Sequence, residues 1–207
     1  MRTRNRLSKV AGLFVVAALV SVGSADVQFG VNGGLSWPFD AGADDFNTGF
    51  AAGAHGFIVV TPNLLLGARA AYNRWGIDED EIRNDFVDVI DADVDGATHV
   101  IELLPAARLM SDLYDWPFDI FAHAAVGVYI RTQHAGLEGE TADGEEVDID
   151  LFDETDGRLG LQVGGGLSLG KTNGLTVELY PLYNLIFSGE ELSQYMTANV
   201  GIVLRLP

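Results

Sequence analysis

The chain of 207 residues contains no cysteine, so neither disulfide bonds nor thiolate chemistry can contribute to its stability or activity. Basic residues are also scarce: 12 Lys and Arg stand against 30 Asp and Glu, giving a formal net charge of -18. Nucleic-acid binding depends on Lys and Arg for phosphate contacts, and a chain this acidic is therefore not expected to bind DNA or RNA. Beyond residue 25 there is one lysine, Lys171.

Long apolar runs are missing everywhere except near the N-terminus. There, Val10–Val22 follows four basic residues and precedes the small residues Gly23 and Ala25. The run of about 13 residues is short for the roughly 20 that a membrane-spanning helix needs. Residues 1–25 are therefore predicted to be a cleaved signal peptide, and residues 26–207 a single exported domain without a transmembrane helix.

The remaining sequence alternates between apolar and small or polar residues with a period of two. Val27, Phe29 and Val31, for example, are separated by Gln28 and Gly30. Alternation of this kind predicts strands. The predicted strands cover roughly residues 27–37, 48–60, 64–75, 98–110, 117–131, 158–170, 174–187 and 194–206. Strands of about 11–15 residues exceed the usual five to six of globular proteins and are typical of tilted strands that cross a membrane.

The connections between these strands alternate in length. Short turns such as "TPN" and "KTNG" lie at one rim, and the longer segments, including Gly76–Ala97 and Thr132–Gly157, lie at the other. The longer segments together hold 24 of the 30 acidic residues. This arrangement predicts a barrel with short turns at one rim and longer, acidic segments at the other.

The polar face of the strands decides which side meets water. It carries Gly, Ala, Ser, Asn and Gln with isolated charges, whereas a soluble barrel would place many Lys and Glu there. Small residues with a few opposed charges are what a narrow barrel encloses. The predicted interior polar network comprises Arg69, Glu102, Arg108, Asp119, His123, Arg131, Glu178 and Arg205. Aromatic residues near strand ends are predicted to form girdles at the membrane surfaces: Trp37, Tyr72, Trp75, Trp116, Phe118, Tyr183 and Phe187.

The sequence therefore predicts an all-β fold, an eight-stranded antiparallel up-and-down transmembrane β-barrel with short periplasmic turns and long acidic outer loops. In these features the chain resembles the small outer-membrane barrels of the OmpA/OmpX type. The resemblance implies location in the cell outer membrane, contact with its lipid, insertion by the barrel-insertion machinery and a monomeric state. It also implies termini on the periplasmic side and acidic loops at the cell surface. Those families end on an aromatic residue, whereas this chain ends on Pro207.

The segment "DADVDGATHVIE", Asp91 to Glu102, fits the calcium-loop pattern D-x-D-x-D-G-x5-E. An EF-hand needs a helix on each side, but the sequence after the loop alternates like a strand and contains Pro105, which disfavours a helix interior. Glu102 is instead expected inside the barrel, paired with Arg69 or Arg108. No firm cofactor is predicted. Weak binding of Ca²⁺ or Mg²⁺ by acidic loops is proposed, with the candidates Asp91, Asp93 and Asp95.

No catalytic motif stands out. One class of lipid-A-modifying barrels uses a His-x-Ser pair, and none of the four histidines has a serine two residues later: His55, His99, His123 and His134. An interior filled by side chains is expected for eight strands, which argues against a pore. The predicted role is structural, adhesive or surface-interacting, with an unknown surface partner. Two alternatives remain open: a soluble periplasmic lipocalin-like barrel that carries a small apolar ligand, and a lipid-active barrel enzyme.

Overall fold

The computed structural model describes residues 26–39, 47–76, 89–111, 118–141, 146–170, 174–188 and 191–206. These residues form the strands β1 (Val27–Pro38), β2 (Gly49–Thr61), β3 (Leu64–Gly76), β4 (Val89–Met110), β5 (Phe118–Thr141), β6 (Glu146–Leu169), β7 (Leu175–Ser188) and β8 (Glu191–Leu206). Within these ranges, no helix is long and apolar enough to cross a bilayer.

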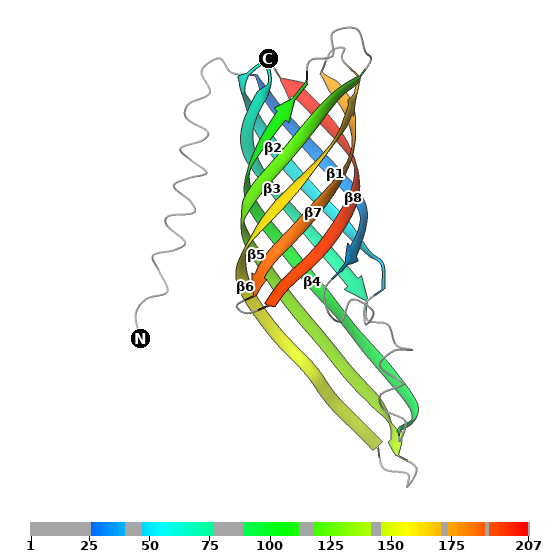
Figure 1. The fold of residues 1–207 in the computed structure, drawn as a ribbon. Helices are drawn as coiled ribbons and strands as arrows, with labels where there is room; N and C mark the ends of the chain where they lie inside the picture. Colours follow the sequence, from blue (N-terminus) through cyan, green and yellow to red (C-terminus); the bar gives the residue numbers. More distant parts are fainter. Residues whose placement is uncertain are drawn as a thin grey trace, which may run out of the picture.

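The strands form a closed barrel in which each pairs antiparallel with the next along the chain (Figure 1). Pairing of β1 with β8, from Val27 opposite Leu206 to Pro38 opposite Tyr195, closes the cylinder. Closure removes the unpaired sheet edges that would otherwise expose backbone donors and acceptors. The predicted eight-stranded antiparallel up-and-down barrel is confirmed.

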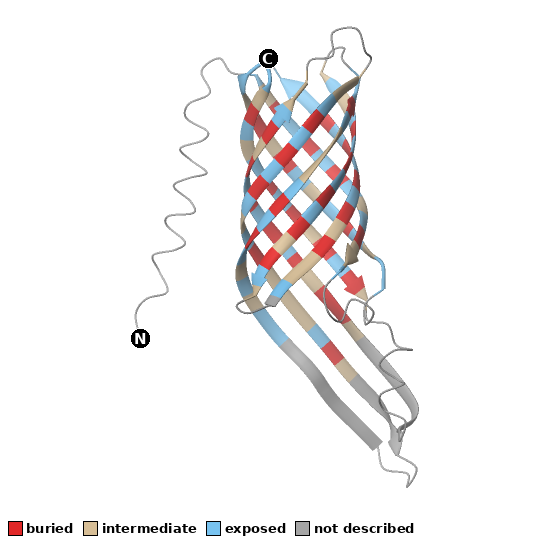
Figure 2. Ribbon diagram, in the orientation of Figure 1, coloured by how far each residue is buried: buried red, intermediate tan, exposed pale blue. Residues whose placement is uncertain are grey.

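Alternation along each strand separates an inner polar surface from an outer apolar one. In β1, Gln28, Asn32 and Ser36 are buried, whereas Val31 and Leu35 are exposed. Successive side chains of a strand point to opposite faces of the sheet, so one parity faces the interior and the other faces outward. The same pattern recurs around the cylinder as a chequerboard of buried and exposed residues (Figure 2).

The rim that carries the C-terminus is closed by compact turns. At the β2–β3 turn, Leu64 N donates to Thr61 Oγ1 at 3.1 Å, and Asn63 Nδ2 donates to the Met110 carbonyl at 2.8 Å. At the β4–β5 connection, the backbone N–H of Ser111 donates to the Ile120 carbonyl at 2.8 Å and so joins the end of β4 to the start of β5. These bonds tie neighbouring turns together and fix the register of the strands that enter the barrel.

The opposite rim differs from the prediction. Three strands continue well beyond the barrel: β4 starts at Val89, β5 runs to Thr141 and β6 starts at Glu146. Together they form a three-stranded sheet that projects from the cylinder (Figure 1). The segments predicted as long loops, 76–97 and 132–157, are therefore partly strand. We call the projecting part of β4, β5 and β6 the extension.

The extension also changes the interpretation of the calcium-like segment. Asp91, Asp93 and Asp95 lie on β4, not in a loop between helices. Their side chains, and residues 77–88 before them, lie outside the described part of the chain. The alternation of apolar and acidic residues in "VDVIDADVDG" and "EVDIDL" accounts for the strands, since a period of two suits an extended ribbon whatever the polar residue is.

Candidate functional site

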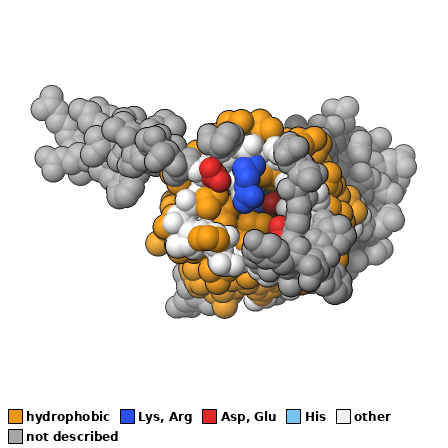
Figure 3. All heavy atoms as spheres, turned by 90° about the horizontal axis from the view of Figure 1, so that it is seen from above, with side chains coloured by type: hydrophobic (Ala, Val, Ile, Leu, Met, Phe, Trp, Pro, Cys, Tyr) orange, Lys and Arg blue, Asp and Glu red, His pale blue; other side chains and the backbone are white. Residues whose placement is uncertain are grey.

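The interior of the barrel gathers charged and polar side chains from nearly every strand. Seen along the barrel from the end with the C-terminus, hydrophobic side chains form the outer wall and basic and acidic side chains lie within it (Figure 3). Five of the predicted network residues are buried: Arg69, Glu102, Arg108, His123 and Glu178. Burial of charge is tolerated only where partners satisfy it, so the contacts of each group decide its role.

Glu102 of β4 is the centre of the larger cluster. Its carboxylate accepts four hydrogen bonds, from Arg69 Nη1, Asn73 Nδ2 at 2.7 Å, Tyr195 Oη at 2.6 Å and Gln162 Nε2 at 2.9 Å. The donors come from β3, β6 and β8. Two oxygens of a carboxylate offer about four acceptor positions, so this buried anion is fully satisfied. The sequence left Arg69 and Arg108 open as partners of Glu102, and the structure selects Arg69.

Further hydrogen bonds link this cluster to β5 and β7. Gln162 Nε2 also donates to Asn184 Oδ1 at 2.7 Å, and Tyr129 Oη donates to the same oxygen at 3.2 Å. His123 Nε2 lies 3.1 Å from Gln162 Oε1. Tyr129, Gln162 and Tyr195 belong to this network in the structure and were not among the residues predicted for it. The alternation along β8 could have predicted that Tyr195 faces inward, because it lies two and four residues before the inward-facing Thr197 and Asn199.

A second cluster centres on Arg108, whose Nη1 donates to Glu178 Oε1 at 2.6 Å. The Arg108 guanidinium lies over three aromatic rings, 4.7 Å from the centroid of Phe57, 4.2 Å from that of Phe121 and 5.9 Å from that of Tyr180. Ring faces attract cations, and the attraction strengthens in a dry interior. Arg108 is thus held by one carboxylate and three rings, which fixes it across the lumen between β4 and β7.

His55 of β2 adjoins this second cluster. Its Nε2 lies 3.9 Å from Glu178 Oε2, and its ring packs 5.4 Å from the Phe57 ring. Gly30 on β1 makes room for the imidazole, because a Cβ at that position would meet the His55 ring. His55 and His123 are both buried among lumen residues. Both therefore serve as packing groups of the interior.

The other predicted network residues lie at the barrel ends. Arg131 is half-buried with its Nε 3.9 Å from Asp156 Oδ1, at the end nearest the extension. Arg205 is exposed at the short-turn end, where Gln28 can accept from its Nη2 at 2.6 Å. Asp119 is half-buried at the same end. These three residues lie at the ends of the barrel, away from the clusters around Glu102 and Arg108.

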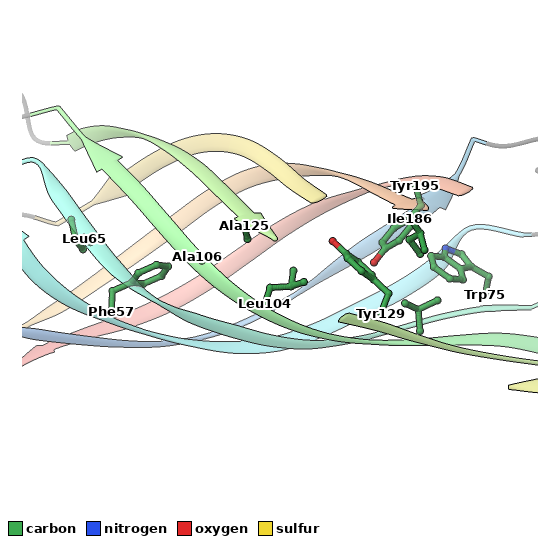
Figure 4. Close-up of a cluster of buried hydrophobic side chains, with 10 residues drawn as sticks. Phe57, Leu65, Trp75, Leu104, Ala106, Ala125, Tyr129, Ile186 and Tyr195 are labelled. Carbon is green, nitrogen blue, oxygen red and sulfur yellow. The ribbon is translucent and has the colours of Figure 1, made fainter. Parts of the chain in front are cut away.

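The lumen is packed. Phe57 and Leu65 fill one end of the buried apolar cluster, and Trp75, Tyr195 and Ile186 fill the other (Figure 4). The cavity found at the Trp75 end has a volume of about 30 Å³. A cavity of this size has room for about two water molecules.

The exterior carries the hydrophobic residues. Side chains of Leu, Val, Ile and Phe are exposed on all eight strands, and these include Phe29, Phe50, Leu66, Leu103, Val126, Leu161, Leu179 and Ile202. Exposed apolar patches on soluble monomers rarely exceed a few hundred Å². A continuous belt around a cylinder is the arrangement of a transmembrane barrel.

Most of the predicted girdle residues face outward. Tyr183 and Phe187 are exposed, and Trp37, Tyr72 and Phe118 are partly exposed. Trp75 departs from the prediction: it is 4% exposed and packs inside against Tyr195, with ring centroids 5.0 Å apart. It has the parity of Arg69 and Asn73, which also point inward. Trp116 lies outside the described residues.

Among the described residues, no group of three or more His, Asp or Glu side chains is placed to hold a metal ion. The buried carboxylates of the barrel are engaged by arginine, amide and phenol donors instead.

Comparisons with known proteins agree with this geometry. The sequence matches no protein-family profile and no curated protein. Among solved structures, it is similar to Ail, the attachment invasion locus protein of Yersinia pestis, with a TM-score of 0.51 and 12% identity over 88% of this chain and 99% of Ail. It is also similar to a major outer membrane protein of Thermus thermophilus, with a TM-score of 0.50 and 12% identity over 87% of this chain and 99% of that one. The fold is that of the small eight-stranded outer-membrane barrels. The resemblance inferred from the alternation is confirmed at the level of fold.

Proposed function

We propose that the chain is an integral barrel of the bacterial outer membrane, exported by the signal peptide of residues 1–25 and inserted by the barrel machinery as a monomer. The observation that carries this proposal is the reversed polarity of the cylinder. Leu103 on the outside is 50% exposed, whereas its neighbour Glu102 is 0% exposed. Water would favour the opposite arrangement, and a hydrocarbon surrounding favours this one. A soluble carrier with an apolar lumen would need Leu and Val at the centre.

Fractionation tests this placement. The protein expressed with its full N-terminus is expected in the outer-membrane fraction, resistant to carbonate washing, and to migrate differently in detergent gels before and after heating. Release into the soluble periplasmic fraction would contradict the proposal. Cleavage after Ala25, read by mass spectrometry of the mature N-terminus, tests the signal peptide separately.

For the role of the protein, we propose a structural and surface-interacting function carried by the extension, without catalysis. The packed lumen supports this, because the charges of each buried ion pair are engaged with one another. The solved structure of Ail contains the heparin analogue sucrose octasulfate. A polyanion of that kind suits the present chain poorly, since its net charge is -18 and 19 of its 30 acidic residues lie in residues 76–97 and 132–157. A cationic surface partner is the better match.

Divalent cations are the simplest such partners. The backbone register places Asp93 opposite Glu138, and Glu138 opposite Asp148, so three acidic residues follow one another across the extension. Like charges directly opposite one another destabilise strand pairing. Millimolar Ca²⁺ or Mg²⁺ should therefore stabilise the extension. NMR of the protein in detergent or nanodiscs should give higher order parameters for residues 89–96 and 136–150 with calcium than with chelator, and identical values would count against divalent binding.

A further inference from the structure

The outer surface of the barrel bears almost no charge. The barrel here is the part from the short-turn rim to the level of Gly76. Arg74 of β3 is the sole Lys, Arg, Asp or Glu among the described strand residues that face outward from the barrel. Its side chain is exposed and makes no hydrogen bond or ion pair with another described residue. An arginine on the lipid side of a barrel is costly unless it reaches the polar interface, so its position along the strand matters.

Arg74 lies where the apolar belt ends. The register places Arg74 opposite Phe50 on β2 and opposite His99 on β4. The same row continues across β5 and β6 through Thr132 and Thr155, whose hydroxyls lie 3.1 Å apart. The next outward row toward the barrel centre is apolar apart from Tyr72, with Ala52, Ile101 and Ile130. Apart from Phe50 the row of Arg74 is polar, and it lies one step beyond Tyr72, at the level expected for a membrane interface and its lipid headgroups.

His99 is held in place beside Arg74. Its Nδ1 lies 2.6 Å from Tyr72 Oη, and its ring stacks on Tyr72 with centroids 5.9 Å apart. Tyr72 is in turn packed against Phe50, with centroids 5.8 Å apart. When Nδ1 accepts a hydrogen bond from the Tyr72 hydroxyl, the imidazole carries its own proton on Nε2, which becomes a hydrogen-bond donor.

We propose that Arg74 and His99 form a binding site for a phosphate group of an outer-leaflet glycolipid, on the outside of the barrel at the rim of the extension. A guanidinium binds phosphate oxygens through paired N–H donors, and a fixed imidazole N–H adds a further donor. The apolar belt directly below accepts the acyl chains of the same lipid, so headgroup and tail are bound by adjacent surfaces. Lipid bound at this site would also hold the base of the extension close to the membrane surface. The acidic residues elsewhere on that rim repel anionic headgroups. This inference rests on the proposed membrane location.

The test uses the full mature chain refolded into nanodiscs, with lipid binding measured by native mass spectrometry and titration. Bisphosphorylated lipid A should bind more tightly than the same lipid after removal of its phosphates. Arg74→Gln should weaken binding of the phosphorylated form about fivefold, the factor expected for one basic side chain at an anionic lipid surface. Arg74→Lys should retain part of the affinity, and His99→Phe, which keeps the ring stack, should cause a smaller loss.

Arg205→Gln is the matched control, because it removes an exposed arginine at the opposite end of the barrel and should leave lipid binding unchanged. Equal affinities for the wild type and Arg74→Gln would overturn the proposal, as would equal losses in Arg74→Gln and Arg205→Gln. Competition by excess inorganic phosphate would assign the site to free anions and overturn the lipid assignment. If the wild type does not enter nanodiscs or show heat-dependent mobility, the proposed membrane function fails first, and that outcome is distinct from an inserted barrel without phosphate preference.

Discussion

Glu102 and Arg69 illustrate how a charged pair is tolerated inside a narrow barrel. Both side chains are almost completely shielded from water, and the carboxylate replaces its lost hydration with four donors from three other strands. Moving an unpaired ion of this size into a dry interior costs several kcal/mol, so removal of one partner is much more damaging than the net value of the pair suggests. The pair therefore stabilises one particular alignment of strands more than it adds overall stability.

Glu102→Gln should lower the free energy of unfolding by about 3–5 kcal/mol, because Arg69 loses its counter-charge while remaining buried. The double variant Arg69→Met/Glu102→Gln should be less destabilised than the single variant, since it leaves no buried guanidinium without its counter-charge. Urea unfolding in lipid bilayers, followed by tryptophan fluorescence, measures both. A loss below about 1 kcal/mol for Glu102→Gln, as for an exposed pair, would refute the buried ion pair.

Parity along each strand predicted which residues enter the lumen, and it did so for Arg69, Glu102, Arg108 and Glu178. Trp75 was misplaced because its aromatic character near a strand end was given more weight than its parity, which matches Arg69. The pairing of Arg108 with Glu178 could not be derived from neighbouring strands. The two residues lie on β4 and β7, and their contact depends on the diameter of the closed barrel.

At the scale of the strands, glycines set how closely neighbouring ribbons approach. Gly67 on β3 faces inward, and a Cβ there would meet the Gly56 carbonyl oxygen and lie 2.8 Å from Phe57 Cα on β2. Backbone atoms cannot move aside as the tip of a flexible side chain can. Gly76, at the end of the same strand, has nothing within 4 Å of its Cβ position. One strand therefore provides both a crowded and an open glycine.

Gly67→Ala should destabilise the barrel by about 1–3 kcal/mol, the usual cost of forcing extra atoms into a packed region. Gly76→Ala is the control and should stay within about 0.5 kcal/mol of the wild type, as surface substitutions do. The comparison is made by urea titration of both variants in the same lipid. Similar stabilities for the two variants would mean that β2 and β3 are not as close as the structure places them.

The extension marks the limit of what the sequence predicted for the strands. Five strands, β1, β2, β3, β7 and β8, were located to within three residues at each end, because apolar side chains on one parity gave a clear period of two. For β4, β5 and β6 only the ends at the short-turn rim were located as closely. Beyond the barrel portions of β4, β5 and β6, aspartate and glutamate become the dominant polar residues of the alternation. Their number suggested solvated loops, although the alternation itself had not stopped. Charge density was given more weight than period, and period was the better guide to backbone conformation.

At the scale of the whole molecule, the decisive property is that polar side chains lie inside the barrel and apolar side chains outside, the reverse of a soluble barrel. Polar groups such as Gln162 and Asn184 are fully buried, and Leu and Val face outward around the cylinder. The hydrophobic effect cannot favour this arrangement in water, because the apolar belt would remain exposed. The fold is thus stable only where hydrocarbon covers the belt, and the location of the protein follows from its surface.

A charge scan along β4 and β8 tests this surface directly. Leu103 lies midway along the barrel portion of β4 and is 50% exposed, whereas Leu206 lies at the short-turn end and is 43% exposed. In a bilayer, Leu103→Arg should cost about 2–4 kcal/mol and Leu206→Arg about 0–1 kcal/mol, since the penalty for arginine depends on depth. In a soluble barrel, both substitutions would place a charge in water and change stability by less than about 0.5 kcal/mol. The measurement is the free energy of folding into lipid vesicles. Equal small losses of stability for Leu103→Arg and Leu206→Arg would contradict the membrane location, because the cost of arginine would then not depend on depth.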